Sequence, residues 1–307
     1  MTIQSGVSVA PGDQPWVRET LEAAGIPVVP LGEATRGLIW MGFHDPTGLA
    51  AALGSAPAVE WVQLPSAGSD DFANAGVLNP ALTWTSAKGA YSRPVAEHAL
   101  TLALAVLRRI PERSRATEWG EQAGTSLYNL RVVIVGAGGV AQELIRLLAP
   151  FNTSITVVRR KPEAVVGAAR TVTADQLGDV LGSADVVFIA AALTITTQAL
   201  VGADELAVMP KSAVLVNVAR GGLVDLDALT TTLATGDLAG AALDVTNPEP
   251  LPAHHPLWRE PRALITPHTA DTWEMIQPLL AARIVTNARH FLAGTAPEGV
   301  VDPEWGY

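Results

Sequence analysis

The sequence predicts an α/β fold with parallel sheets, divided into two domains. Short apolar runs alternate with helical patterns along the chain, and this order is typical of parallel sheets. Many of these runs are continuously apolar, as in strands that are buried on both faces. One stretch, residues 130–160, has the full order of strand, glycine turn, helix and strand. A chain of 307 residues with 49% hydrophobic residues can bury a large core and is long enough for two domains.

The first 93 residues read as short strand–helix units. A helix is expected from Gln14 to Ala24, where Gly25 stops it. The loop PSAGSD at residues 65–70 follows an apolar run, and its small residues expose N–H groups that can hold a carboxylate. On the residues alone, a simple turn is the favoured interpretation of this loop. The runs that predict strands cover residues 7–9, 28–29, 38–41, 61–64 and 82–84.

A long helix is expected to begin at Pro94. Glu97 and His98 lie in its first turns, where a structural role is the more common one. A helix that is apolar on two sides is expected to be buried between domains or at a subunit contact. One apolar stripe consists of Val95, Ala99, Leu102 and Val106, and a second face of Leu100, Leu104 and Leu107.

The glycine turn has the pattern G-x-G-x-x-A and is typical of dinucleotide binding. Gly136 permits a tight turn, and Gly138 lets the backbone approach a pyrophosphate. Ala141 is small enough for the helix to pack on the strand. The N–H groups at the start of the helix, near Gly139 and Val140, would bind the pyrophosphate. The alternative is an ordinary strand–helix turn with convenient glycines.

The end of the second strand of this unit indicates which dinucleotide binds. An NAD-binding unit usually has an acidic residue there, which accepts hydrogen bonds from the ribose 2′-OH. This chain has Arg159, Arg160 and Lys161 instead. Guanidinium groups can pair with a 2′-phosphate, which a carboxylate would repel. We therefore expect a preference for NADP(H), with NAD(H) also possible; the alternative is a basic surface turn that contacts nothing.

Strand and helix patterns continue after the cofactor unit. Asp225 is expected to cap a helix that runs to Thr235, with Gly236 beyond its end. A short helix is expected from Asp204 to Met209, and a final helix from Met275 to Leu292. The remaining predicted strands cover residues 185–190, 213–218, 241–245 and 263–266.

Three chemically useful side chains follow strands of this second part. His268 can give a proton to the alkoxide that forms when a ketone accepts a hydride. Glu249 can hold the imidazole, and Arg220 can pair with a carboxylate and polarise the carbonyl beside it. Each of these residues alone would more often be structural.

Composition excludes several classes of function. The net charge is −10, without basic blocks, which argues against nucleic acid or an anionic membrane as a partner. There are no cysteines, so disulfides, thiolate catalysis and cysteine metal sites are excluded, and no metal is expected. No signal peptide or membrane-length apolar run is visible, so we expect a cytoplasmic protein.

Several motifs resemble those of the D-isomer-specific 2-hydroxyacid dehydrogenase family. VNVARGGLVD at 216–225 is similar to the segment around the family's substrate-binding arginine, which gives that role to Arg220. ALDVTNPEPLP at 242–252 and ITPHTA at 265–270 resemble the segments of its glutamate and its acid/base histidine, Glu249 and His268. LPSAGSDDF at 64–72 resembles the loop whose backbone binds the substrate carboxylate, at Ala67 and Gly68. This resemblance favours substrate binding over the simple turn.

The resemblance also implies an architecture. A Rossmann cofactor domain, residues 94–274, would be inserted in a flavodoxin-like substrate domain made of residues 1–93 and 275–307. Both would be doubly wound. Members of the family are usually dimers that pair through the cofactor domain and the long helix, so a homodimer is expected. The resemblance places Asp244 near the nicotinamide carboxamide. With the residues already named, Ala191, Ala219 and Arg220 complete the expected cofactor contacts.

These observations predict an NADP(H)-dependent oxidoreductase that transfers a hydride between nicotinamide and C2 of a small 2-ketoacid or D-2-hydroxyacid. Glyoxylate and hydroxypyruvate are the expected substrates, by resemblance to NADP-preferring members. Residues near Met41 to His44, Ser66 to Ser69 and Trp258 would shape the pocket. Two alternatives remain open: a dinucleotide-sensing binding protein or corepressor on the same fold, and a dehydrogenase of a substrate that is not a 2-hydroxyacid.

Overall fold

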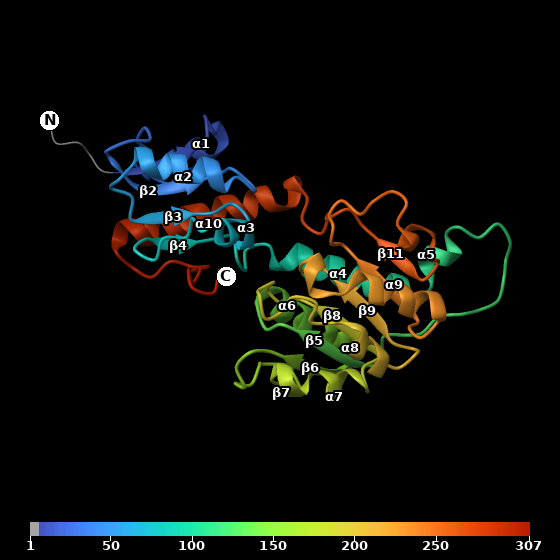
Figure 1. Cartoon of the computed structure of the whole chain (residues 1–307). Coiled ribbons are helices and arrows are strands. Elements are labelled where there is room, and N and C mark those ends of the chain that lie inside the picture. Colours follow the sequence, from blue (N-terminus) through green and yellow to red (C-terminus); the bar gives the residue numbers. More distant parts are fainter. Residues whose placement is uncertain (1–5) are drawn as a thin grey trace. The chain divides into compact units, whose positions relative to one another are not determined.

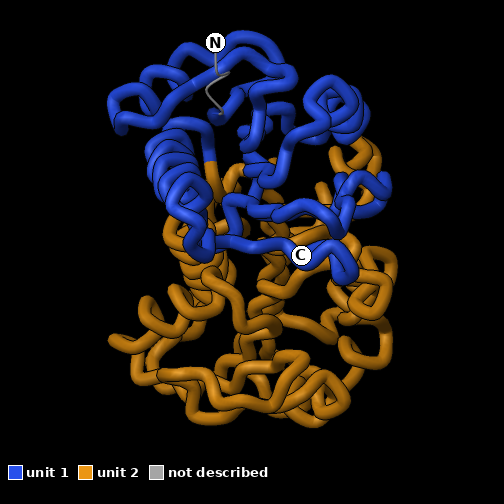
Figure 2. The backbone as a smooth tube through the Cα atoms, turned by 90° about the vertical axis from the view of Figure 1, so that its left-hand side faces the viewer, with its two compact units in different colours: residues 1–91, 272–307 blue, residues 92–271 orange. Residues whose placement is uncertain are grey.

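The computed structural model describes residues 6–307 (Figure 1). The chain forms two compact units, shown in two colours in Figure 2. Unit 1 consists of residues 1–91 and 272–307, and unit 2 of residues 92–271. The predicted domain boundaries lie after residues 93 and 274, and the compact units divide after residues 91 and 271.

Unit 2 is built on a seven-stranded sheet in the order β11-β10-β9-β8-β5-β6-β7. All of its strand pairs are parallel, which confirms the predicted class. The strand order reverses between β5 and β8, so a crevice at the carboxyl ends of these strands can receive a ligand. In chain order the strands are β5 Arg131–Val135, β6 Ser154–Val158, β7 Arg170–Val172, β8 Val186–Ile189, β9 Val214–Asn217, β10 Gly240–Leu243 and β11 Ala263–Ile265.

Helices cover both faces of this sheet. On one face, Val132 and Ile134 of β5 pack with helices α4 and α6. On the other face, Val133 and Val135 pack with α7, α8 and α9. Because successive side chains of a strand point to opposite faces, the continuous apolar run of β5 serves both cores. The helices are α4 Ser92–Leu107, α5 Ile110–Arg113, α6 Gly139–Leu148, α7 Leu177–Leu181, α8 Ala203–Val208 and α9 Leu226–Thr235, with 3₁₀ turns η1 Ala149–Phe151, η2 Ala174–Gln176, η3 Gly221–Leu223 and η4 Pro256–Arg259.

Local signals in the sequence explain where α9 begins and ends. The Asp225 side chain accepts hydrogen bonds from the N–H groups of Asp227 and Ala228, as an N-cap does. Gly236 ends the helix in the left-handed conformation, with φ +78°. Leu229 and Leu233, one turn apart, are fully buried, and each contributes about 1.5–3 kcal/mol by leaving water.

Unit 1 has a four-stranded parallel sheet in the order β1-β2-β3-β4. One side of the sheet packs on α2 and α3 through Leu49 and Phe72. Helix α10 contacts α1, β2 and β3, and its Phe291 stacks on Trp61 at 5.2 Å between ring centroids. The elements are β1 Gly6–Ala10, α1 Pro15–Ala23, β2 Thr35–Trp40, α2 Pro46–Ser55, β3 Trp61–Gln63, α3 Asp70–Asn74, β4 Thr83–Thr85 and α10 Trp273–Ala293.

The strand predicted at Val28-Val29 is reduced to a single parallel bridge between Val28 and Val7. Pro27 and Pro30 flank this dipeptide, and neither has an N–H group to extend the ladder. The bridge lies on the edge of β1 opposite to β2. This short segment therefore gives unit 1 the reversed strand order of a doubly wound sheet.

The second segment of unit 1 completes its core. Asn287 of α10 is fully buried and donates to Gln63 Oε1 at 2.7 Å. Gln63 also accepts from Thr85, whose hydroxyl accepts from the Trp61 indole at 2.8 Å. Beyond α10, an antiparallel bridge pairs Val300 with Thr85 at the sheet edge. Among residues 6–307, no helix is long and apolar enough to cross a membrane.

Candidate active site

The glycine turn lies between β5 and α6 at the reversal of strand order. Gly136 has φ +116°, and a Cβ on it would lie 2.3 Å from the Ala190 carbonyl oxygen, so this position requires glycine. Gly138 is the N-cap of α6, and a Cβ there would meet no described atom within 4 Å. The backbone at Gly138 is therefore open to the close approach of a ligand. It lies next to the first-turn N–H groups near Gly139 and Val140, which helix geometry leaves without intrahelical partners. This arrangement fits a pyrophosphate.

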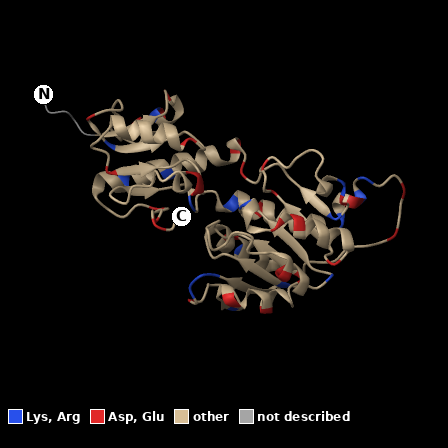
Figure 3. Ribbon diagram, in the orientation of Figure 1, with Lys and Arg blue, Asp and Glu red and all other residues tan. Residues whose placement is uncertain are grey.

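Basic residues follow β6, the strand next to β5. Figure 3 shows their charges on the loop between β6 and β7. The Arg159 side chain is 28% exposed and lies near Glu163, with 3.2 Å to its carbonyl oxygen and 3.8 Å to its carboxylate. Arg160 is exposed. The edge of the sheet that would meet the adenosine ribose therefore carries guanidinium groups where an NAD-binding unit has a carboxylate.

Arg220 follows β9, and the side chain of Asn217 stabilises its turn through hydrogen bonds to the backbone. The Asn217 amide is 1% exposed; it donates to the Arg220 carbonyl at 2.9 Å and accepts from the Ala219 N–H at 3.0 Å. One Arg220 guanidinium nitrogen donates to the Ala219 carbonyl at 2.8 Å. Sequence analysis did not single out Asn217, although a lone Asn in an apolar strand is a signal for such a turn.

The Arg220 turn packs directly on the segment that carries Glu249. A Cβ on Gly221 would lie 2.0 Å from the Thr246 carbonyl carbon, so only glycine allows this approach. Within this second segment, the Thr246 hydroxyl donates to the Pro248 carbonyl at 2.8 Å. The N–H group of Thr246 donates to Glu249 Oε2 at 3.4 Å. The backbone thus fixes one oxygen of the Glu249 carboxylate.

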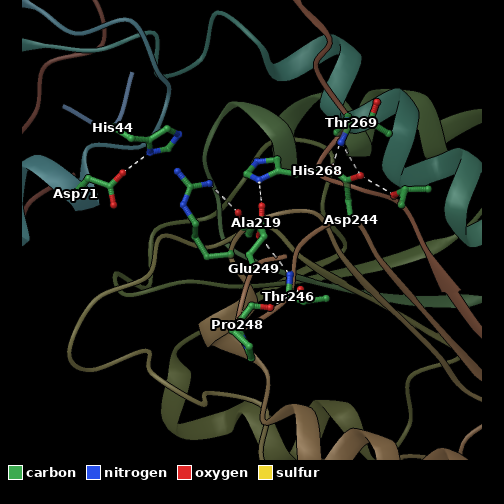
Figure 4. Close-up of polar contacts among 12 residues, drawn as sticks. His44, Asp71, Ala219, Asp244, Thr246, Pro248, Glu249, His268 and Thr269 are labelled. Carbon is green, nitrogen blue, oxygen red and sulfur yellow. Dashed lines mark hydrogen bonds and ion pairs between the residues drawn. The ribbon is translucent and has the colours of Figure 1, made fainter. Parts of the chain in front are cut away.

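His268 and Glu249 form a close pair (Figure 4). The distance from His268 Nδ1 to Glu249 Oε1 is 2.5 Å, and the two side chains are 42% and 41% exposed. A carboxylate only accepts hydrogen bonds, so Nδ1 carries the proton of this contact. Within residues 6–307, the structure gives the opposite ring nitrogen, Nε2, no protein partner. The pair therefore presents Nε2 for a proton transfer to or from a bound molecule.

A buried carboxylate holds the loop on which His268 lies. Both oxygens of Asp244 accept: Oδ1 from the Thr266 hydroxyl at 2.5 Å and the Thr269 N–H at 3.0 Å, and Oδ2 from the Ala270 N–H at 3.1 Å. Burial alone would raise the pKa of Asp244, but hydrogen bonds from His98, Thr266 and these backbone groups outweigh it and lower the pKa. The assignment of Asp244 to the nicotinamide carboxamide stays a prediction.

Asp271 is a further acidic residue that sequence analysis did not single out. Burial raises its pKa, and the negative charge of Asp244 raises it further, whereas the positive charges of His268 and Arg220 oppose the shift. Asp271 therefore shares the electrostatic environment of the candidate catalytic residues. No local motif marked it, because its effect depends on segments that are distant in sequence.

The loop at residues 65–70 belongs to unit 1. Its carbonyl groups are occupied: Ser66 accepts from the Ala87 N–H at 2.9 Å, Ala67 from the Ser86 hydroxyl at 3.2 Å, and Gly68 from the Ser66 hydroxyl at 2.6 Å. Within the described chain, the N–H groups of Ala67 and Gly68 have no acceptor. A loop with held carbonyls and available N–H groups is suited to an anion. In the same unit, His44 pairs with Asp71 (Figure 4).

The chain matches a family model and is similar in sequence to several known proteins. The family model described as "D-isomer specific 2-hydroxyacid dehydrogenase, NAD binding domain" matches residues 100–270. An uncharacterized protein of Corynebacterium melassecola is 39% identical over 267 residues, which are 83% of this chain and 88% of that protein. A glyoxylate reductase of Thermofilum pendens is 31% identical and covers 83% of this chain and 78% of its own.

A solved structure extends the comparison to nearly the whole chain. It is a D-isomer specific 2-hydroxyacid dehydrogenase from Xanthobacter autotrophicus Py2, in complex with NADPH and MES. That chain is 27% identical, with a TM-score of 0.85 over 99% of this chain and 100% of its own.

Proposed function

Since this chain belongs to the D-isomer specific 2-hydroxyacid dehydrogenase family, we propose that it is an NADP(H)-dependent reductase of small 2-ketoacids such as glyoxylate or hydroxypyruvate. Enzyme class follows from the family: the chain is a nicotinamide-dependent D-2-hydroxyacid dehydrogenase. The single observation that carries the proposed chemistry is the His268–Glu249 pair. The two residues follow the adjacent strands β11 and β10, and their contact orients an imidazole that can act as an acid or a base.

The residues around the glycine turn fit a dinucleotide. Gly136 and Gly138 leave room for a pyrophosphate at the start of α6. Arg159 and Arg160 would hold the 2′-phosphate, and this supports NADP(H) over NAD(H). Ala191, Ala219 and Asp244 follow β8, β9 and β10, where they would border the nicotinamide. When bound, NADPH supplies a hydride to C2 of the ketoacid.

Each remaining part of the reaction is assigned to a residue of this chain. Arg220 would pair with the substrate carboxylate and polarise the adjacent carbonyl. His268 Nε2 would donate a proton to the carbonyl oxygen as negative charge develops there. Glu249 would hold the imidazole and stabilise its charged form. In unit 1, substrate binding by the N–H groups of Ala67 and Gly68 stays a prediction from the resemblance of their loop.

A parallel oxidation assay tests the proposed function. NADPH and NADH oxidation would be followed at 340 nm with glyoxylate, hydroxypyruvate and pyruvate, each over a range of concentrations. We expect oxidation of NADPH with glyoxylate or hydroxypyruvate and a higher kcat/KM for NADPH than for NADH. Faster NADH oxidation would keep the enzyme class and remove the cofactor preference. Absence of oxidation with a wider set of ketoacids would favour a binding protein or a different substrate.

We also propose that the enzyme acts as a homodimer. Trp119 is 92% exposed and Ile110 is 53% exposed, and both lie on the segment that follows α4. Aromatic side chains are enriched at protein–protein interfaces relative to the rest of the surface. Light scattering with size-exclusion chromatography would give twice the chain mass. A Trp119→Ser variant should weaken the dimer, whereas Trp258→Ser, at another exposed tryptophan, should leave the measured mass unchanged.

A further inference from the structure

His98 of α4 contacts the carboxylate that anchors the His268 loop. Its Nε2 atom lies 3.3 Å from Asp244 Oδ1 and 3.1 Å from the Thr266 hydroxyl oxygen. The His98 side chain is 20% exposed and that of Asp244 is 1% exposed. Helix α4 packs against β9, β10 and β11, so this contact joins the helix to the carboxyl ends of two strands. His98 takes no part in the proposed hydride and proton transfers.

The hydrogen-bond pattern fixes the tautomer of His98. The Thr266 hydroxyl has one proton, and it donates this proton to Asp244 Oδ1 at 2.5 Å. Both neighbours of His98 Nε2, the carboxylate oxygen and the hydroxyl oxygen, therefore act as acceptors. Nε2 must carry a hydrogen, which it shares between them. His98 is thus a donor to a buried carboxylate.

The Asp244 carboxylate in turn controls the backbone of the loop. Three of its contacts come from the side chain of Thr266 and the N–H groups of Thr269 and Ala270, on either side of His268. The His268 N–H donates to the Asp244 carbonyl at 2.8 Å. His268 itself has φ +49°, the left-handed conformation, which is unfavourable for a residue with a side chain. Such a conformation persists only where its surroundings determine it.

We propose that His98 is a positioning residue for His268. By donating to Asp244 and Thr266, it fixes the rotamers of both side chains. These side chains then hold residues 266–270 in the conformation that brings the His268 imidazole onto Glu249. Its effect on turnover rests on the proposed function, because it acts through the acid/base role of His268. The predicted contact between Asp244 and a nicotinamide carboxamide is compatible with this role, since Oδ2 accepts only the Ala270 N–H within the described residues.

Kinetics of two pairs of variants test the proposal. His98→Leu removes the donor, whereas the amide of His98→Gln can still donate from a similar position. Thr266→Val removes the hydroxyl, whereas Thr266→Ser keeps it. We expect kcat to fall about 10- to 100-fold in the Leu and Val variants, because the acid is displaced from its reacting geometry. KM for the ketoacid and NADPH should change less than about twofold, since Arg220 and the glycine turn are untouched, and the Gln and Ser variants should recover most of kcat.

Three outcomes would overturn the proposal. They are an unchanged kcat in His98→Leu, a change confined to KM, and a His98→Gln variant that loses as much turnover as His98→Leu. Circular dichroism and thermal melting would establish that the variants are folded, so that a lost kcat reports on positioning. A folded His98→Leu enzyme with normal cofactor affinity and reduced kcat would support the inference.

A second readout does not require turnover. With ¹⁵N-labelled histidine, the wild-type spectrum should contain a protonated Nε2 for His98, identified by its loss in His98→Gln, and the His268 signals should shift in His98→Leu. An unprotonated Nε2, or His268 signals that do not move, would reject the contact or its transmission. If the wild-type protein reduced no ketoacid, the proposed function would fail, while these spectra would still decide whether His98 positions the loop.

Discussion

His268 Nδ1 and Glu249 Oε1 lie 2.5 Å apart, although 19 positions separate the two residues in the sequence. The pairing arises because β10 and β11 are adjacent parallel strands, so the segments that follow them meet at one edge of the sheet. Glu249 is fixed from one side by the Thr246 N–H, and His268 by the Asp244 carbonyl. The backbone therefore places both partners before any substrate binds.

Replacing the acid/base residue should separate turnover from binding. His268→Asn should lower kcat about 10²- to 10⁴-fold, because an amide cannot supply the proton. The dissociation constant for NADPH, measured by fluorescence titration, should stay close to that of the wild type. His254→Asn, at an exposed histidine of the same unit, provides the control and should keep full turnover. If His268→Asn retained turnover, the assigned role would be removed.

The basic loop after β6 should determine cofactor preference. Arg159→Ala removes a guanidinium that could pair with the 2′-phosphate, and hydrogen bonds to charged groups contribute about 1.5–3 kcal/mol. We expect kcat/KM for NADPH to fall roughly 10- to 100-fold while kcat/KM for NADH changes little. Arg170→Ala, at an exposed arginine of β7, should affect neither. An equal loss with both cofactors would contradict 2′-phosphate recognition.

Gly221 should be required for stability, because the backbone of Thr246 approaches it closely. A Cβ on Gly221 would lie 2.0 Å from the Thr246 carbonyl carbon, so Gly221→Ala must push apart the turns that carry Arg220 and Glu249. We expect a loss of about 2–3 kcal/mol in the free energy of unfolding, together with reduced kcat. Gly178→Ala, in a helix of the same unit with no atom within 4 Å of the new Cβ, should not reduce stability. Urea unfolding and thermal melting would compare the two.

The Asp244 carboxylate should make stability depend on pH. Its folded-state pKa is lowered, so its contribution is present above the unfolded value of about 3.9 and is lost as pH falls through the folded value. Asp244→Asn should therefore cost about 2 kcal/mol of unfolding free energy at pH 7, because buried donors lose their acceptor. The difference from the wild type should narrow as pH falls below about 4. Urea unfolding at a series of pH values measures this.

Asp271 should behave with the opposite sign. Burial raises its folded-state pKa, so its contribution is present below the unfolded value near 3.9 and is lost as pH rises through the folded value. The stability of Asp271→Asn relative to the wild type should accordingly increase as pH rises above about 4. If both variants followed the same pH trend, the environments assigned to the two carboxylates would be wrong.

Much of the fold could be predicted from local patterns. Apolar runs marked most strands, and Asp225 and Gly236 marked both ends of α9 correctly. At Val28-Val29 the structure has a single bridge in place of the predicted strand, because the prolines beside this dipeptide prevent a continuous ladder. Residues 46–55 and 170–172 were not predicted as elements, since α2 has few large side chains and β7 is only three residues long.

The candidate site was accessible to sequence analysis where a motif carries it. Arg220, Glu249 and His268 were expected after strands of one sheet, and the structure finds them after β9, β10 and β11. The roles of these residues stay predictions. Asn217, His98 and Asp271 were not recognised as parts of the site, because each acts through partners that only the tertiary structure brings close. Burial and hydrogen-bond geometry, which decide such roles, are not encoded in local spacing.

The division of unit 1 into two segments has a consequence for biosynthesis. Residues 92–271 are contiguous, so unit 2 can fold as soon as they have left the ribosome. Unit 1 must wait for residues 272–307, because Asn287, Phe291 and the bridge at Val300 come from that segment. Until then, the nascent chain exposes the face of β3 that carries Trp61. A translation product truncated before residue 272 should therefore contain a folded unit 2 and an aggregation-prone N-terminal segment.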